Sequence, residues 1–532
     1  MLLARLLTLL AATLVMLLIG EAVVRWLDGY ALSHPRLERV AVASTSRTRL
    51  ALVERHLANL ADVPEIEPQW FALDPPPLVG RETPAELTRL AGEIRDLQIQ
   101  REFLRVYNRK AADRIFCDWF RTTVEEFPGF AFVYDPADGL GYPTFRNYPS
   151  ITTPLGLVTN RWGWRGRDIE VDKPPGTIRI AFIGGSTTIN GHGFPHSYPE
   201  YIEHWLNLWA RARELPVRFE SLNLGRSGAN SADLVAVVKQ ELLPVEPDLA
   251  LYYEGANHFK SVRFSIESSD ASGLQGPTGV AMMREAAAGA RQGVRDYSAL
   301  IGRLAYNLAA FTQASGRELP RPDYSVTWPE GLDEQDPDLD RRDLPLLLFM
   351  QLENIEAIRS ALDRIGAELV LSSFVWLVAD GLVLDPLRHE YLYQHLNGPY
   401  WPLSYKDHRR FLDFQNRVYR RYAASRGLAF IDMATLFPDD PDLFVDGMHR
   451  VDAGVRLHAW LTFRELLPVI RERIRTGALP RPDREPQHSP PGFPMEITRM
   501  PVECPSPSSA RGGSAVDGSW SAPLSLPVPS AS

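Results

Sequence analysis

A serine, a histidine and an aspartate in this 532-residue chain have the types and spacing needed for nucleophilic catalysis. Ser186 lies in "RIAFIGGSTTINGHG", where an apolar run leads directly into two glycines, a serine and two threonines. A serine hydroxyl is a weak nucleophile, so it needs a base within reach and a third group that orients the base. Asp446 and His449, in "VDGMHRVDAG", have side chains suited to these two tasks. On its own, however, a serine after a strand is more often the N-cap of the next helix.

Strand-like and helix-like segments alternate from residue 177 to residue 476, and this alternation is typical of a parallel α/β sheet. Apolar runs predict strands over 177–184, 217–225, 248–255, 367–375 and 428–433. Helical periodicity predicts helices over about 198–213, 231–243, 346–364, 406–425 and 451–475. Asp452 is expected to be the N-cap of the last helix.

Polar or glycine-rich segments follow four of the five predicted strands. Ser186 follows the first strand, Gly228 the second in "LNLGRSGANSADL", and Asn257 the third in "YYEGANHF". Asp446 and His449 lie a short distance after the fifth. Ligands of open α/β sheets bind beyond the carboxyl ends of the strands. The sequence therefore predicts that these residues meet at one edge of the sheet.

These four blocks, in this order, resemble the SGNH hydrolase superfamily of GDSL-type esterases and lipases. The family's marker residues map onto Ser186, Gly228, Asn257 and His449, with Asp446 three residues before the histidine. The resemblance implies a flavodoxin-like three-layer sandwich with a parallel sheet of about five strands. It also implies a Ser186, His449 and Asp446 triad, and an oxyanion hole formed by the backbone N–H groups of Ser186 and Gly228 and the side-chain amide of Asn257.

The resemblance covers roughly residues 155–475. The phrase "TNRWGWRG", residues 159–166, looks like the segment that precedes the first block in the membrane-tethered branch of the superfamily. Two positions depart from the common pattern, because Gly185 and His258 stand where many members have Asp. A GGS first block occurs among relatives, so we expect it to keep activity. We expect His258 to alter the hydrogen bonds of the site.

Composition excludes several other classes of protein. The net charge is −9 and no Lys/Arg-rich block is present, which argues against nucleic-acid binding. Two cysteines are too few for a disulfide framework. His192 and His196 have the spacing of zinc ligands, but Pro195 between them breaks the helix that would align them. No phosphate loop and no GxGxxG motif follow the first strand, so the sequence predicts neither a metal nor a cofactor.

The amino terminus has a membrane-targeting character. Residues 6–20, "LLTLLAATLVMLLIG", form an uncharged apolar run behind Arg5. No clear small-residue cleavage site follows Gly20, so residues 1–27 are predicted to be an uncleaved signal anchor. A cleaved signal peptide and a buried helix are the alternatives. Because large domains translocate largely regardless of charge, we expect the rest of the chain to lie outside the cytoplasm.

The remaining chain divides into three predicted zones. Residues 28–150 read as a helical accessory region, and residues 151–476 as the α/β domain, with a partly helical insert over about 260–345. Residues 477–532 are rich in Pro and Ser and are predicted to be disordered.

Together these features predict a membrane-anchored serine esterase that acts on an O-acyl group of an envelope glycan or a lipid. An O-acyltransferase that uses the same triad is a second hypothesis, and a non-catalytic glycan-binding or assembly protein on a hydrolase fold is a third. The expected partners are the acylated substrate and the membrane; the sequence indicates no protein partner.

Overall fold

The computed structural model describes residues 2–27, 53–58, 60–81, 157–190, 195–226, 229–257, 297–304, 325–384 and 403–481, with a few isolated residues between these ranges. The disordered tail is predicted over 477–532. Its first five residues, 477–481, are described and pack against the α/β domain, where Leu479 is buried and Arg481 donates to Asp248 (2.9 Å). Residues 482–532 lie outside the described residues. So do most of the accessory region predicted over 28–150 and most of the insert predicted over 260–345.

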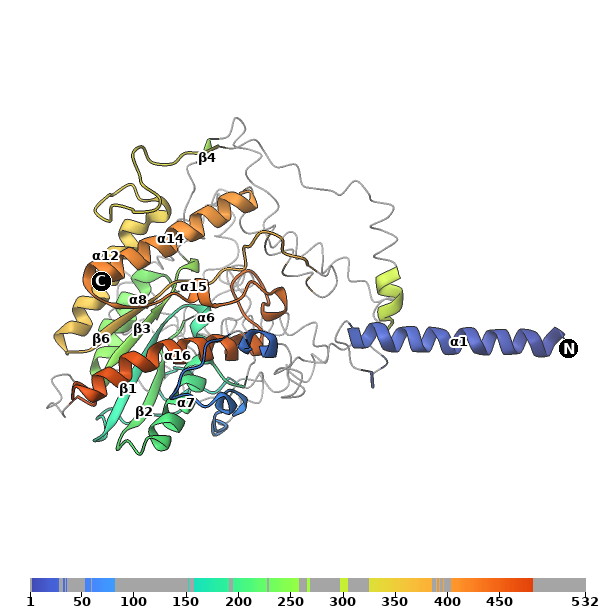
Figure 1. Ribbon diagram of the computed structural model, residues 1–532, viewed down its shortest axis with the longest axis horizontal. Coiled ribbons are helices and arrows are strands. Elements are labelled where there is room, and N and C mark those ends of the chain that lie inside the picture. The colour runs from blue at the N-terminus through green and yellow to red at the C-terminus, as the bar shows by residue number, and fades with distance from the viewer. Residues whose placement is uncertain are drawn as a thin grey trace, which may run out of the picture.

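The centre of the molecule is a five-stranded parallel sheet (Figure 1). Its strands are β1 (Thr177–Gly184), β2 (Arg218–Asn223), β3 (Leu249–Tyr253), β6 (Glu368–Ser372) and β7 (Ala429–Ile431). They lie in the order β2-β1-β3-β6-β7. When the five strands are counted in chain order, this is the 2-1-3-4-5 order of flavodoxin-like sheets. The predicted fold class is confirmed.

Helices cover both faces of the sheet. One face carries α7 (Tyr198–Ala212) and α16 (Asp452–Arg475), and the other carries α8 (Ser231–Val237), α12 (Leu348–Arg364) and α14 (Tyr405–Arg426). Every residue of β1 is buried, because alternate side chains enter the two cores. Ile180 and Phe182 pack toward α7 and α16, whereas Ala181 and Ile183 pack toward α8 and α12. The result is a three-layer sandwich.

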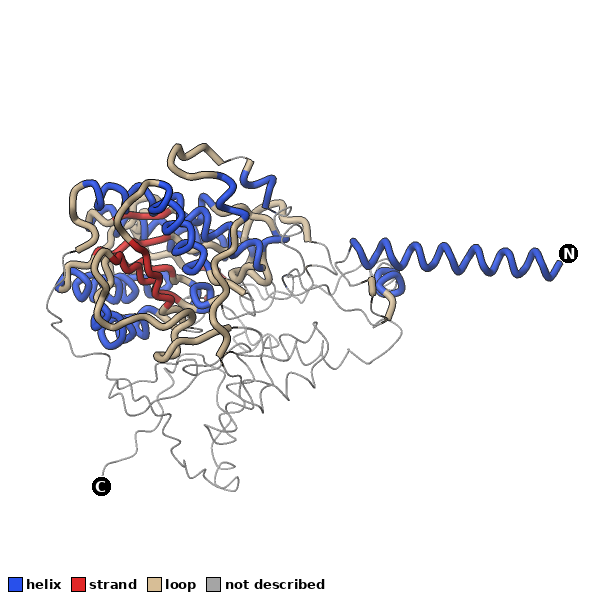
Figure 2. The backbone as a smooth tube through the Cα atoms, turned by 90° about the horizontal axis from the view of Figure 1, so that it is seen from below, coloured by secondary structure: helices blue, strands red, loops and turns tan. Residues whose placement is uncertain are grey.

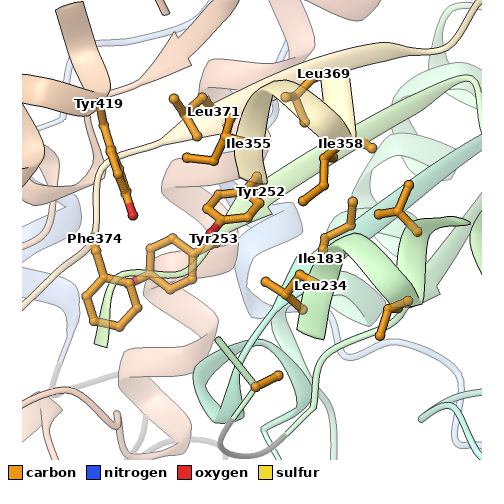
Figure 3. Close-up of a cluster of buried hydrophobic side chains, with 14 of the residues drawn as sticks. Ile183, Leu234, Tyr252, Tyr253, Ile355, Ile358, Leu369, Leu371, Phe374 and Tyr419 are labelled. Carbon is orange, nitrogen blue, oxygen red and sulfur yellow. The ribbon is translucent and has the colours of Figure 1, made fainter. Parts of the chain in front are cut away.

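The core between the sheet and helices α8, α12 and α14 contains side chains from strands and helices that are far apart in the sequence. Figure 3 shows Ile183 of β1, Tyr252 of β3 and Leu371 of β6 facing Leu234 of α8 and Ile355 of α12. All five side chains are fully buried. This core fixes β1 and β3, the strands that lead to Ser186 and Asn257.

The remaining elements are one long helix near the amino terminus and several short helices and strands. They are α1 (Leu2–Leu27), η1 (Pro68–Ala72), α6 (Ser186–Ile189), the π-helix η5 (Val238–Leu242), η6 (Leu243–Val245), β4 (Ile266–Glu267), β5 (Ser325–Val326), η9 (Pro345–Leu347), α15 (Met433–Leu436) and η10 (Pro441–Leu443). β4 and β5 form a separate antiparallel pair.

The predicted strands and helices are all present, with differences at their ends. The helix predicted over 231–243 continues beyond α8 as a π-helix from Val238. The prediction that Asp452 is the N-cap of the last helix is wrong: Val451 has the extended cap conformation, and Asp452 is the first helical residue. An acidic side chain in the first turn still interacts favourably with the helix N-terminus.

A short part of the N-terminal region is built into the α7 and α16 layer. The indole N–H of Trp205 donates to the carbonyl oxygen of Trp70 (2.8 Å), and Arg456 donates to that of Phe71 (2.9 Å). The Phe71 ring packs edge-on against Trp460, at 5.5 Å between ring centroids. The described residues around η1 therefore belong structurally to the α/β core.

α1 projects away from the rest of the molecule in both Figure 1 and Figure 2. Its residues Ala4–Trp26 are long and apolar enough to cross a membrane, and none of the most apolar part is buried. A signal sequence has the same length and composition.

Candidate active site

Ser186 lies just beyond the carboxyl end of strand β1, at the start of α6. Gly184 ends the strand, Gly185 is the helix N-cap, and Ser186 is the first helical residue, so it is not the cap. Its backbone N–H belongs to the first turn of α6, where N–H groups have no acceptor within the helix. Its hydroxyl Oγ lies 2.6 Å from Nε2 of His449.

Asp446 and His449 lie in the loop between η10 and α16. Oδ2 of Asp446 lies 2.7 Å from Nδ1 of His449. Oδ1 of the same carboxylate accepts the backbone N–H groups of Met448 (2.9 Å) and His449 (2.7 Å). Because Nδ1 must donate to a carboxylate, the neutral imidazole has Nε2 free to accept a proton. The serine, histidine and aspartate side chains thus form one continuous hydrogen-bonded chain, as their sequence positions predict.

The aspartate of this hydrogen-bonded series is more buried than the histidine. The side chain of Asp446 is 8% exposed and that of His449 is 13% exposed. A carboxylate so shielded interacts more strongly with its partner than it would in water. The arrangement can hold the imidazole in one orientation and stabilise a positive charge on it.

Asn257 follows β3 and reaches the loop after β2. Its side-chain amide Nδ2 donates to the carbonyl oxygen of Ala229 (2.8 Å) and makes a longer contact with Oε2 of Glu254 (3.4 Å). Its backbone N–H donates to Oε1 of Glu254 (2.7 Å). The structure therefore brings Asn257 beside the loop that contains Gly228. Gly228 itself and His258 lie outside the described residues.

Glu254 is a buried residue at the end of β3, where the sequence places a polar group but assigns it no role. A Cβ atom at Gly185 would lie 2.4 Å from Oε2 of Glu254 and 2.8 Å from Nδ2 of Asn257. A side chain at position 185 would therefore displace both groups. Its position one residue beyond β3 was the available signal, but the sequence does not show that it bonds Asn257.

The "TNRWGWRG" segment, residues 159–166, holds the carboxyl-terminal end of α6 in place. The buried guanidinium of Arg165 donates to the carbonyl oxygens of Ile189 (3.3 Å) and Asn190. Asn223, at the end of β2, donates to the carbonyl oxygen of Thr188 (3.0 Å). These bonds satisfy the last carbonyl groups of a helix that is too short to be stable alone. They fix α6, and through it Ser186.

Arg450, the residue after His449, belongs to a buried cluster of basic and aromatic side chains. Arg450 donates to the hydroxyl of Tyr253 (2.5 Å), and its guanidinium carbon lies 4.7 Å from the centroid of the Phe437 ring. His458 packs against Tyr253 at 4.8 Å between ring centroids. Burial, together with the Arg450 cation, holds the pKa of His458 well below its usual value. His458 is therefore neutral near pH 7 and adds no charge to the site.

Within the described ranges, no three His, Cys, Asp or Glu side chains gather in a group that could hold a metal ion. His196 is buried against the ring of Tyr201, and His192 lies outside the described residues.

No protein-family model and no curated protein matches the chain. Similar solved structures include a variant of an acetyl xylan esterase from Geobacillus stearothermophilus, with 14% identity and a TM-score of 0.30 over 56% of this chain and 97% of that chain. A GDSL-like lipase from Bacteroides thetaiotaomicron has 11% identity and a TM-score of 0.25 over 56% of this chain and 88% of that chain. An alpha/beta hydrolase from the metagenome of Lake Arreo has 15% identity and a TM-score of 0.28 over 54% and 94%.

Likenesses with such TM-scores carry no argument about activity, and the fold assignment stands on the order and direction of the strands.

Proposed function

We propose that the chain is a serine hydrolase that cleaves a carboxylic ester through an acyl-enzyme. The observation that supports this most is the hydrogen-bonded order of Ser186 Oγ, His449 Nε2 (2.6 Å), His449 Nδ1 and Asp446 Oδ2 (2.7 Å). A nucleophile, a base and an orienting carboxylate in this order are the general requirement for activating a serine.

In the proposed first step, Oγ of Ser186 attacks the ester carbonyl carbon while its proton moves to Nε2 of His449. Asp446 stabilises the resulting imidazolium. The tetrahedral intermediate collapses when the carbon–oxygen bond to the alcohol breaks, and the imidazolium returns its proton to the leaving alcohol. The same base then activates water, which attacks the acyl-enzyme and releases the carboxylic acid and free Ser186.

The negative oxygen of the intermediate needs hydrogen-bond donors. We assign this task to the backbone N–H groups of Ser186 and Gly228 and to the side-chain amide of Asn257. Support comes from the position of Ser186 in the first turn of α6 and from the side-chain amide of Asn257, whose Nδ2 lies beside Gly185, the residue before Ser186.

The substrate is proposed to be an O-acyl group on an envelope glycan or a lipid, and the enzyme to be anchored by α1 with its α/β domain outside the cytoplasm. The apolar, exposed α1 supports the anchor. Two alternatives remain from the sequence: an O-acyltransferase that passes the acyl group to a sugar hydroxyl, and a non-catalytic binding protein.

The test uses the full chain in detergent with aryl esters of increasing acyl length. We expect turnover in the unmodified protein and a loss of about 10³-fold or more in kcat in Ser186→Ala and His449→Ala. Ser425→Ala is the matched control, because Ser425 lies in the last turn of α14, just before β7 begins, at the opposite edge of the sheet. Ester turnover that survives Ser186→Ala would refute the proposal.

The same preparation separates the alternatives. An acyl group recovered on an added oligosaccharide, and not as free acid, would favour the transferase. A protein that is inert toward esters and acceptors but binds glycan, equally well with Ser186→Ala, would favour the binding protein.

A further inference from the structure

The carboxyl-terminal end of α1 is bonded to a short helical segment of the insert, residues 297–304. The carboxylate of Glu21 accepts hydrogen bonds from the hydroxyl of Ser298 (2.7 Å) and from the backbone N–H groups of Ala299 (2.9 Å) and Leu300 (3.0 Å). Arg25 pairs with Glu21 (2.7 Å) and also donates to the carbonyl oxygen of Tyr297 (2.7 Å). Two charged side chains of α1 are thus used to hold the beginning of this segment.

The segment lies across α1 near its carboxyl-terminal end, as both Figure 1 and Figure 2 show. The two helices approach closely, because a Cβ atom at Gly20 would lie 3.3 Å from Cδ2 of Leu300. If α1 crosses a membrane along its normal, a helix that lies across its end runs along the membrane surface.

Three side chains of this segment are apolar and exposed. Tyr297, Ile301 and Leu304 are 49%, 41% and 58% exposed. Ile301 and Leu304 are three residues apart within the helical residues 299–304 and so lie on one face of that helix, and Tyr297 lies just before it. A helix with one apolar face at a bilayer surface buries that face at the boundary between headgroups and acyl chains.

Aromatic side chains lie at the carboxyl-terminal end of α1, where the segment is bonded. Trp26, in the last turn of α1, is 73% exposed, and Tyr297, whose carbonyl oxygen accepts from Arg25, is the first residue of the segment. Trp and Tyr are enriched where a membrane meets water. Exposed apolar side chains therefore lie both on the segment and on the end of α1 that it contacts.

We propose that residues 297–304 are a second membrane contact: an interfacial helix, held against α1 by Glu21 and Arg25, whose Tyr297, Ile301 and Leu304 face the acyl chains. The occupant of this face is the lipid bilayer, because the segment contacts a helix already long enough to span one.

The experiment places an environment-sensitive fluorophore on single cysteines of the full chain, with Cys117 and Cys504 replaced by Ser. The protein is reconstituted in vesicles of phosphatidylcholine and phosphatidylglycerol that carry lipid quenchers at shallow or deep positions. A label at Ile301→Cys should be quenched most by the shallow lipids, and one at Leu14→Cys by the deep lipids. A label at Met350→Cys, exposed on α12, should report water.

A second variant tests the link to α1. Glu21→Ala should move the Ile301 label toward water and leave the Leu14 label unchanged, whereas Thr13→Ala, a control within α1, should change neither. The proposal is overturned if the Ile301 label reports water while the Leu14 label is quenched. It is also overturned if the Ile301 label is shielded yet unaffected by lipid quenchers, as a protein partner would produce, or if the Leu14 label itself reports water. None of these readings depends on ester turnover.

Discussion

Replacing Asp446 by asparagine should reverse the proton arrangement of His449 without moving the loop. Oδ1 of Asp446 accepts two backbone N–H groups, from Met448 (2.9 Å) and His449 (2.7 Å). An asparagine has only one acceptor oxygen, and that oxygen must face these two donors. The NH₂ group must then point at Nδ1 of His449 and donate to it. The imidazole proton consequently moves to Nε2, where it faces the hydroxyl of Ser186 and blocks proton acceptance.

The expected loss follows from this tautomer. With no base available, kcat/KM should fall by about 10³- to 10⁴-fold, or about 4–5.5 kcal/mol of transition-state stabilisation. The free energy of unfolding should change by less than about 1 kcal/mol, because the amide oxygen still accepts both backbone bonds. Asp446→Ala removes that acceptor, so it should lower the free energy of unfolding by about 2–3 kcal/mol.

Three measurements check this prediction: aryl ester kinetics, urea unfolding of both variants, and ¹⁵N NMR of the His449 ring. The NMR spectrum of Asp446→Asn should show a protonated Nε2 at neutral pH, and that of the unmodified protein a protonated Nδ1. An Asp446→Asn enzyme within tenfold of full activity, or with its proton still on Nδ1, would refute the reasoning.

Three further substitutions probe the surroundings of the site. Gly185→Ala places a Cβ 2.4 Å from Oε2 of Glu254 and 2.8 Å from Nδ2 of Asn257. The crowding should lower kcat by about 10-fold or more and leave KM for the ester unchanged. An unchanged kcat would exclude crowding of these two groups. Arg165→Met removes the donor to the last carbonyl groups of α6, and urea unfolding should show a loss of about 2–4 kcal/mol. The pKa of His458 is depressed below 6.5, so neutral His458 stabilises the fold above that pH, and this contribution to the free energy of unfolding is lost as pH falls, at up to about 1.4 kcal/mol per pH unit. His458→Gln should therefore flatten the pH dependence of the free energy of unfolding. Equal slopes in the variant and the unmodified protein would contradict this.

The strands were predictable because the sheet is buried on both faces. A continuous apolar run such as "TIRIAFIG" has few other places in a folded protein, and β1 spans the predicted 177–184. The ends were less predictable. β2 ends at Asn223 and not at the predicted residue 225, although the N–H of Leu224 still bonds to the carbonyl oxygen of Phe182 (3.0 Å). Such ends depend on neighbouring strands, which a local pattern does not contain.

Some features of the candidate site could likewise be predicted from the sequence, and others could not. The positions of Ser186, Asn257 and His449 could be predicted, because each follows a strand and parallel strands bring their carboxyl ends to one edge. The tasks of Arg165 and Glu254 could not. Arg165 acts on carbonyl groups more than 20 residues away, and Glu254 is held beside Gly185 only by the folded sheet. Contacts of this kind become visible only once the strands are placed.

The most direct test of the central claim is to trap the acyl-enzyme. The full chain, mixed with a slowly hydrolysed aryl ester and quenched in acid, is digested and examined by mass spectrometry. The proposed mechanism predicts one acyl group on the peptide that contains Ser186, formed in a burst with release of the phenol, accumulating in His449→Ala far more slowly and absent in Ser186→Ala. An acyl group on another residue, or steady ester turnover with Ser186 unmodified throughout, would contradict it.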